Sequence, residues 1–190
     1  GPEFSRLGRE VLDGLQKVFR TTDPVVIYPS SGTGAWEAAL VNTLSPGEKV
    51  LMFETGHFAT LWRTLAVKFG LQVEFVPGDW RHGVDPATLE SKLAEDRAHA
   101  IKAVAVVHNE TSTGVTSRVA EIRRRMDRVG HPALLLVDVI SSLACMEYRH
   151  DDWGADVTVC ASQKGLMLPP GLGLNAISQK ALAASKSARL

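Results

Sequence analysis

The sequence predicts an α/β fold in which a mixed, mostly parallel sheet of seven strands lies between helices. Short apolar segments of strand length alternate along the chain with longer segments of helical periodicity. Most of the short segments carry apolar residues on both faces, which is typical of strands covered by helices on each side. The chain has 190 residues and no internal repeat or linker, so we expect one domain over residues 1–190.

The helices are predicted from apolar residues spaced three and four apart and from the residues that end them. Gly70 and Gly130 each end a helical segment, and a Ser-Pro-Gly sequence at residues 45–47 ends another. Ser117 is the expected cap of the fifth helix. The predicted helices span residues 3–20, 35–43, 58–69, 86–95 and 117–129.

The strands are predicted from short apolar segments bounded by turn residues. Most are separated by helices, so we expect them to be parallel. The last two are joined by a loop without a helix, so we expect this pair to be antiparallel. The predicted strands span residues 24–28, 49–54, 72–76, 101–108, 133–140, 157–161 and 173–178.

The charge and the cysteine content limit the classes of partner that the protein can bind and the cellular compartment in which we expect it. The chain has 21 basic and 21 acidic residues, which argues against a nucleic-acid or anionic-membrane partner. No apolar run approaches the roughly 20 residues that a membrane-spanning helix needs. Cys145 and Cys160 are the only cysteines and do not form a disulfide framework. We therefore expect a cytoplasmic protein.

In a largely parallel sheet, ligands bind beyond the carboxyl ends of the strands, where four polar segments of this sequence fall. The first is the glycine-containing turn at residues 30–34. Glycine lets the backbone approach an anion, and the N–H groups at the start of the next helix point at it. The hydroxyls of Ser31 and Thr33 would add donors. A tight turn with a helix cap explains this segment equally well.

The second and third segments contain one ionisable side chain each. Asp138 follows the apolar run of residues 134–137, the most apolar of the predicted strands. A carboxylate there is costly unless it is paired or belongs to a site. An ordinary hydrogen bond to the backbone explains it equally well. Lys164 follows the strand at 157–161 and precedes a glycine- and proline-rich turn. A lysine in a loop is usually a surface charge, but one desolvated in a crevice has the lowered pKa that an amine nucleophile needs.

The fourth segment, residues 108–114, is a dense set of small polar groups that either grip a ligand or cap the next helix. The combination of the four is more specific than any one of them. A phosphate needs backbone donors, a pyridine nitrogen needs a carboxylate, and an aldehyde needs a lysine. Together they match the requirements of pyridoxal 5'-phosphate (PLP).

These segments also resemble the motifs of class V PLP-dependent aminotransferases, and within that class the serine–glyoxylate and alanine–glyoxylate aminotransferases. The resemblance covers the whole chain. Four ordered motifs carry it: Ser-Gly-Thr-Gly-Ala-Trp-Glu-Ala-Ala at 31–39, Glu-Thr-Ser-Thr-Gly-Val at 110–115, Val-Asp-Val-Ile-Ser-Ser at 137–142 and Ser-Gln-Lys at 162–164.

The resemblance implies the large domain of fold type I PLP-dependent transferases and a role for each site residue. Lys164 would form the Schiff base and act as general base, and Asp138 would pair with the pyridine nitrogen. The other implied contacts are Ser31, Gly32 and Thr33 to the phosphate with Gln163 beside it, Thr111 to the phenolic oxygen, and Ile140 and Phe58 to the two faces of the ring.

The resemblance further implies the reaction and the assembly. The amino donor would be serine or alanine, the acceptor glyoxylate or a similar 2-oxo acid, and the full-length protein a homodimer. Family members are about twice as long, so we expect the N-terminal segment and the small C-terminal domain to be absent here. Another class V enzyme, such as a cysteine desulfurase or a phosphonate aminotransferase, and an inactive PLP-binding fragment are the alternatives.

Overall fold

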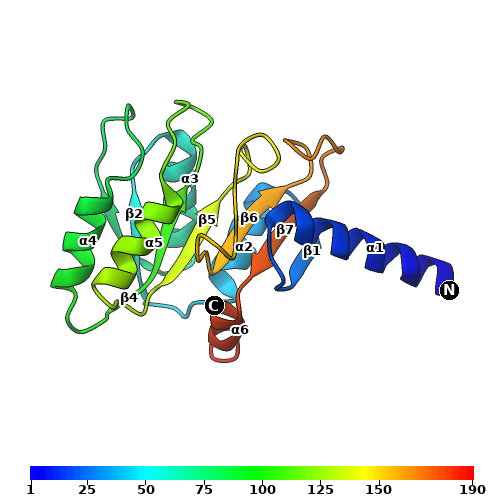
Figure 1. Cartoon of the computed structure of the whole chain (residues 1–190). Coiled ribbons are helices and arrows are strands. Elements are labelled where there is room, and N and C mark those ends of the chain that lie inside the picture. Colours follow the sequence, from blue (N-terminus) through cyan, green and yellow to red (C-terminus); the bar gives the residue numbers. More distant parts are fainter.

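The computed structural model describes residues 1–190 and contains one seven-stranded sheet with the strand order β1-β7-β6-β5-β4-β2-β3 (Figure 1). The predicted fold class is confirmed. The strands are β1 (Val25–Pro29), β2 (Lys49–Phe53), β3 (Gln72–Val76), β4 (Ile101–Val107), β5 (Leu134–Asp138), β6 (Val157–Ala161) and β7 (Leu172–Ile177).

Six helices accompany the sheet, one more than predicted. The additional helix, α6, begins after Ser178, whose hydroxyl accepts a hydrogen bond from the Ala181 amide. The expected cap at Ser117 is wrong, because that hydroxyl accepts from the Val84 amide instead. The helices are α1 (Pro2–Phe19), α2 (Gly32–Val41), α3 (His57–Lys68), α4 (Pro86–Glu95), α5 (Val119–Arg128) and α6 (Gln179–Ser185).

The strand directions place the polar segments at one edge of the sheet. β2 pairs in parallel with β3 and β4, and β4, β5 and β6 continue the parallel series. β7 is antiparallel to β6, as predicted, and also to β1. Thus β1 points the same way as β6, and β7 alone runs opposite. The carboxyl ends of β1, β4, β5 and β6 therefore share an edge.

Helices cover both faces of the sheet, and the strand residues alternate between two apolar cores. Val104 and Val106 of β4 pack with α4, α5 and the end of α1, whereas Ala103 and Ala105 pack with α2, α3 and α6. In β5, Leu134 and Leu136 belong to the second core. Because side chains alternate along a strand, this register also directs Asp138 toward the α2 and α3 face.

The helix α1 extends away from the body of the domain (Figure 1). Phe19, at its last turn, is fully buried in the first core, but Phe4 and Leu7 near its start are 77% and 55% exposed. The predicted amphipathic helix is present, but its apolar stripe is covered only at one end. No helix combines the length and the apolar character needed to cross a membrane.

Candidate functional site

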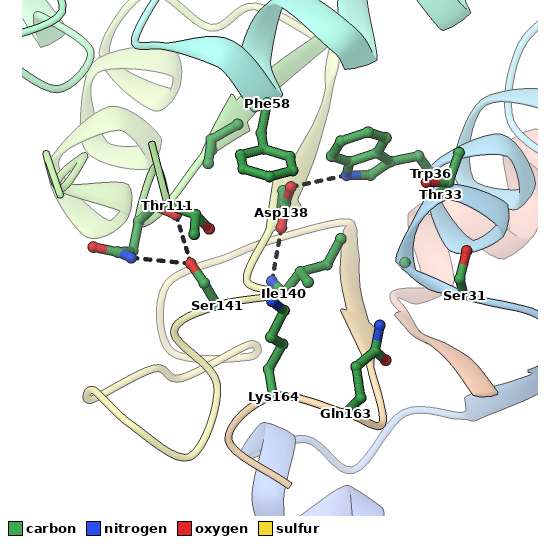
Figure 2. A pocket seen from close by; sticks show the side chains of 13 residues that line it. Ser31, Thr33, Trp36, Phe58, Thr111, Asp138, Ile140, Ser141, Gln163 and Lys164 are labelled. Carbon is green, nitrogen blue, oxygen red and sulfur yellow. Dashed lines mark hydrogen bonds between the residues drawn. The ribbon is translucent and has the colours of Figure 1, made fainter. Parts of the chain in front are cut away.

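A pocket of about 190 Å³ lies at the carboxyl edge of the sheet. It is bounded by the start of α2, the start of α3, and the loops that follow β4, β5 and β6 (Figure 2). All nine residues predicted for the site line it: Ser31, Gly32, Thr33, Phe58, Thr111, Asp138, Ile140, Gln163 and Lys164. Four further residues line it that the sequence reasoning missed: Trp36, Val107, Asn109 and Ser141.

The N-terminus of α2 forms one wall of this pocket. Ser31 is the N-cap residue, yet its hydroxyl makes no capping hydrogen bond and remains available to a ligand. The first turn contains no acidic side chain, so its N–H groups and the helix dipole favour an anion. A Cβ at position 32 would lie 2.5 Å from Cδ1 of Ile140, so that side chain would have to shift to admit any residue larger than glycine. This wall is therefore open to a phosphate and closely packed beneath it.

Asp138 lies at the base of the pocket and is 4% exposed. Its Oδ1 accepts a hydrogen bond of 2.7 Å from the Ile140 amide, and its Oδ2 accepts one of 2.8 Å from the Trp36 indole N–H. Burial nevertheless raises the pKa of Asp138 to about 7, and the neighbouring Glu110 carboxylate adds to this. The backbone hydrogen bond named as the ordinary alternative exists, but the carboxylate also faces the pocket.

Lys164 stands at the mouth of the pocket on the loop after β6. Its ammonium makes no ion pair, and its side chain is exposed, as is that of Met167 further along the same loop at 89%. In residues 1–190 the lysine side chain is therefore open to solvent. Beside it, Oε1 of Gln163 is buried without a partner, so the amide retains capacity for a ligand. Gly165 packs so closely on the Leu143 carbonyl that a Cβ would overlap it.

Phe58 and Ile140 lie on either side of the Asp138 carboxylate in Figure 2. Phe58 comes from the first turn of α3, a helix that has no side-chain cap of its own. Glu110, which is fully buried, supplies that function from a distant loop: its carboxylate accepts from the amides of Phe58 at 3.2 Å and Ala59 at 3.0 Å. The loop after β4 thus holds the start of α3 and its aromatic ring in place.

The same loop supplies the polar side of the pocket. Thr111 is exposed and its hydroxyl makes no hydrogen bond within the chain. Asn109 is tied to the loop after β5, since its amide donates to the Ser141 hydroxyl at 2.9 Å while that hydroxyl donates to the Asn109 carbonyl at 2.8 Å. These two bonds connect the ends of β4 and β5, and Thr111 is left available to a ligand.

The residues of this pocket fit PLP. Phosphate oxygens find free N–H groups and hydroxyls at α2, and a protonated ring nitrogen finds a buried carboxylate at Asp138. Apolar side chains stand where the ring needs packing surfaces, and the amine of Lys164 reaches the same space. No cluster of histidine, cysteine and acidic side chains suited to a metal ion exists in the chain.

Several known proteins with similar sequences are glyoxylate aminotransferases. The chain is 47% identical over all 190 residues to an L-aspartate–glyoxylate aminotransferase of Paracoccus denitrificans, of which it covers 48%. It is 49% identical over 187 residues, 98% of the chain, to a serine–glyoxylate aminotransferase of Hyphomicrobium methylovorum, of which it covers 46%. The chain thus spans about half the length of the curated relatives it matches.

Structural comparison agrees with the sequence similarity. The crystal structure of an alanine–glyoxylate aminotransferase from Nostoc sp. superposes on the whole chain with a TM-score of 0.91 at 30% identity, and 49% of that protein is covered. The family model described as Aminotransferase class-V matches residues 2–189. The chain belongs to the class V aminotransferases.

Proposed function

We propose that residues 1–190 form the cofactor-binding large domain of a PLP-dependent aminotransferase. Its substrates would be serine or alanine as amino donor and glyoxylate or a similar 2-oxo acid as acceptor. The observation that carries the proposal is the meeting of an anion-binding helix N-terminus, a buried carboxylate and a lysine amine in one pocket. The similarity to serine–glyoxylate aminotransferases at 44% and 49% identity supports the choice of substrates. Because the chain spans half of their length, the activity is proposed for the whole protein.

Bound PLP supplies an electron sink for the negative charge that develops at the substrate Cα. The chain's own residues bind and orient it. The first-turn N–H groups of α2 and the hydroxyls of Ser31 and Thr33 hold the phosphate, and the anionic Asp138 keeps the ring nitrogen protonated. Lys164 would hold the cofactor through its amine and would move the substrate Cα proton as general base.

A labelling experiment tests this assignment. With PLP added, the protein should develop a visible absorption band, and borohydride reduction should fix the cofactor on the peptide that contains Lys164. Lys164→Ala should abolish the label, whereas the matched control Lys102→Ala, on an exposed part of β4, should keep it. A label spread over Lys92, Lys102 and Lys180 would show that the pocket is not a specific site. Asp138→Asn should retain the label but lower turnover by orders of magnitude.

No arginine lines the pocket, although a bidentate arginine is the usual partner of a substrate carboxylate. We therefore expect residues 1–190 alone to bind PLP without sustained transamination. An assay with serine, glyoxylate and PLP measures this. Sustained hydroxypyruvate formation that disappears in Lys164→Ala would show that the cofactor pocket suffices.

We propose further that the whole protein is a cytoplasmic homodimer. Two free cysteines support a reducing compartment. The exposed apolar side chains of Phe4 and Leu7 on α1 and of Met167 near the pocket mouth support an interface. Sedimentation equilibrium of the whole protein distinguishes a dimer from a monomer. The desulfurase alternative needs a reactive cysteine at the site: burial raises the pKa of the Cys160 thiol to about 12, and the exposed Cys145 does not line the pocket.

A further inference from the structure

Trp36 was not among the predicted site residues, yet it is the one side chain that bonds the carboxylate at the base of the pocket. It lies on α2 four residues after Gly32, so both face the same side of the helix. Its ring is 4% exposed, and its N–H lies 2.8 Å from Oδ2 of Asp138 (Figure 2). The contact joins residues that are 102 positions apart in the chain.

The indole is itself fixed by its neighbours. It stacks on Trp62 of α3 with ring centroids 5.8 Å apart and an angle of 12° between the planes, and it makes a tilted contact with Phe58 at 6.5 Å. Trp62 is fully buried and lies outside the pocket. The ring of Trp36 cannot turn away from the carboxylate without breaking this packing, so its N–H is directed at Oδ2 in advance of any ligand.

The two hydrogen bonds to Asp138 use different oxygens. The Ile140 amide binds Oδ1, and the Trp36 indole binds Oδ2, so rotation of the carboxylate would break both bonds. Each donor also favours the anionic form over the neutral acid. A group that must carry a negative charge in a buried place gains both its orientation and its charge from these contacts.

We propose that Trp36 is a positioning residue of the reaction: its indole N–H holds the Asp138 carboxylate in the orientation and the anionic form that a protonated pyridine ring requires. The inference deepens the proposed function and rests on it for the identity of the ligand.

The charge of Asp138 is also subject to the ionisable groups around it. Glu110, on the loop after β4, raises the pKa of Asp138. The charge of Asp138 in turn raises the pKa of the Cys160 thiol on β6. Lys164 lines the same pocket. His108, whose amide donates to the Asp138 carbonyl, has its pKa lowered to about 4 by burial and is neutral near pH 7. All of these groups stay unchanged when Trp36 is replaced, so a change in the titration of Asp138 is due to the indole.

The two stacked tryptophans provide a matched pair of variants. Trp36→Phe and Trp62→Phe remove the same atoms from the same stack, but only Trp36 has a hydrogen-bond partner, since Nε1 of Trp62 is buried without one. The cofactor-free protein labelled with ¹³C in its aspartate carboxyl groups reports the pKa of Asp138 directly. Trp36→Phe should raise this pKa by about one to two pH units, and Trp62→Phe should leave it where it is in the unmodified protein.

A second measurement connects the titration to the cofactor. PLP binding followed by visible absorption near pH 7.5 should weaken about 3-fold to 25-fold in Trp36→Phe, in proportion to the lost anionic fraction of Asp138, and stay unchanged in Trp62→Phe. If Trp36→Phe fails to fold, replacing Trp36 by 3-benzothienylalanine keeps the fused ring and removes only the N–H. Equal effects of the two phenylalanine variants, or an unchanged Asp138 pKa without the N–H, would overturn the proposal. Failure of the unmodified protein to bind PLP would refute the proposed function, while the titration would still decide the role of Trp36.

Discussion

Replacing Asp138 by asparagine should stabilise the cofactor-free protein, and the gain should depend on pH. Burial raises the pKa of Asp138 from 3.8 to about 7. Between these two values the folded protein retains a proton that the unfolded chain has released, so raising the pH favours unfolding. The cost is present in full above the pKa of the folded state. Asparagine has a similar shape and no charge, so it removes this cost.

The magnitude follows from the pKa difference. At pH 8 the buried carboxylate costs about 4 kcal/mol, and at pH 5, where it is protonated in the folded state, about 2 kcal/mol. Asparagine can accept only one of the two hydrogen bonds that the carboxylate accepts from Ile140 and Trp36. The donor left facing its amide nitrogen costs about 1–2 kcal/mol at either pH. Asp138→Asn should therefore gain about 2–3 kcal/mol at pH 8 and little at pH 5.

Urea unfolding of both proteins at pH 5 and pH 8 measures these gains. Every other titrating group is common to the two proteins, so the difference between the gains isolates Asp138. A gain that is the same at both pH values, or a loss at pH 8, would refute the reasoning that this carboxylate is held at an energetic cost. Residues that serve a functional site often lower the stability of the fold, and Asp138 is expected to be one of them.

Three further changes test the parts around the carboxylate. Gly32→Ala should weaken PLP binding, measured by visible absorption, because the new Cβ would meet Ile140; unaltered affinity would show that the side chain moves aside freely. Glu110→Gln should lower the free energy of unfolding by about 1–3 kcal/mol through loss of charged bonds to the start of α3, and urea unfolding that matches the unmodified protein would contradict this. Burial lowers the pKa of His108 to about 4, so the unfolded chain binds the extra proton and stability falls as the pH drops below about 6.5. His108→Asn should remove about 2 kcal/mol of the loss between pH 7 and pH 5 in the same assay, and an unchanged acid sensitivity would count against it.

The local sequence pattern was sufficient to predict the strands of the sheet and most of the residues that line the pocket. Strands such as β4 and β5 are apolar on both faces because helices cover both, and that composition is visible in the sequence. Polar residues at the ends of such strands are therefore easy to recognise in the sequence. The parallel arrangement then brings Asp138 and Lys164 to the same edge, since both follow strands that point the same way. The helix α6 was missed although Ser178, its cap, is a recognisable signal.

Only the tertiary structure decided which distant groups meet at that edge. The bond from Trp36 to Asp138 depends on α2 lying against β6 and on the side of β5 from which the carboxylate projects. The capping of α3 by Glu110 depends on the neighbouring positions of β2 and β4. The exposure of Lys164 is likewise visible only in the folded chain, because it depends on which other segments pack against its loop. Periodicity and end signals describe the neighbours of a residue along the chain, whereas these contacts depend on the strand order, and no local pattern specifies that order.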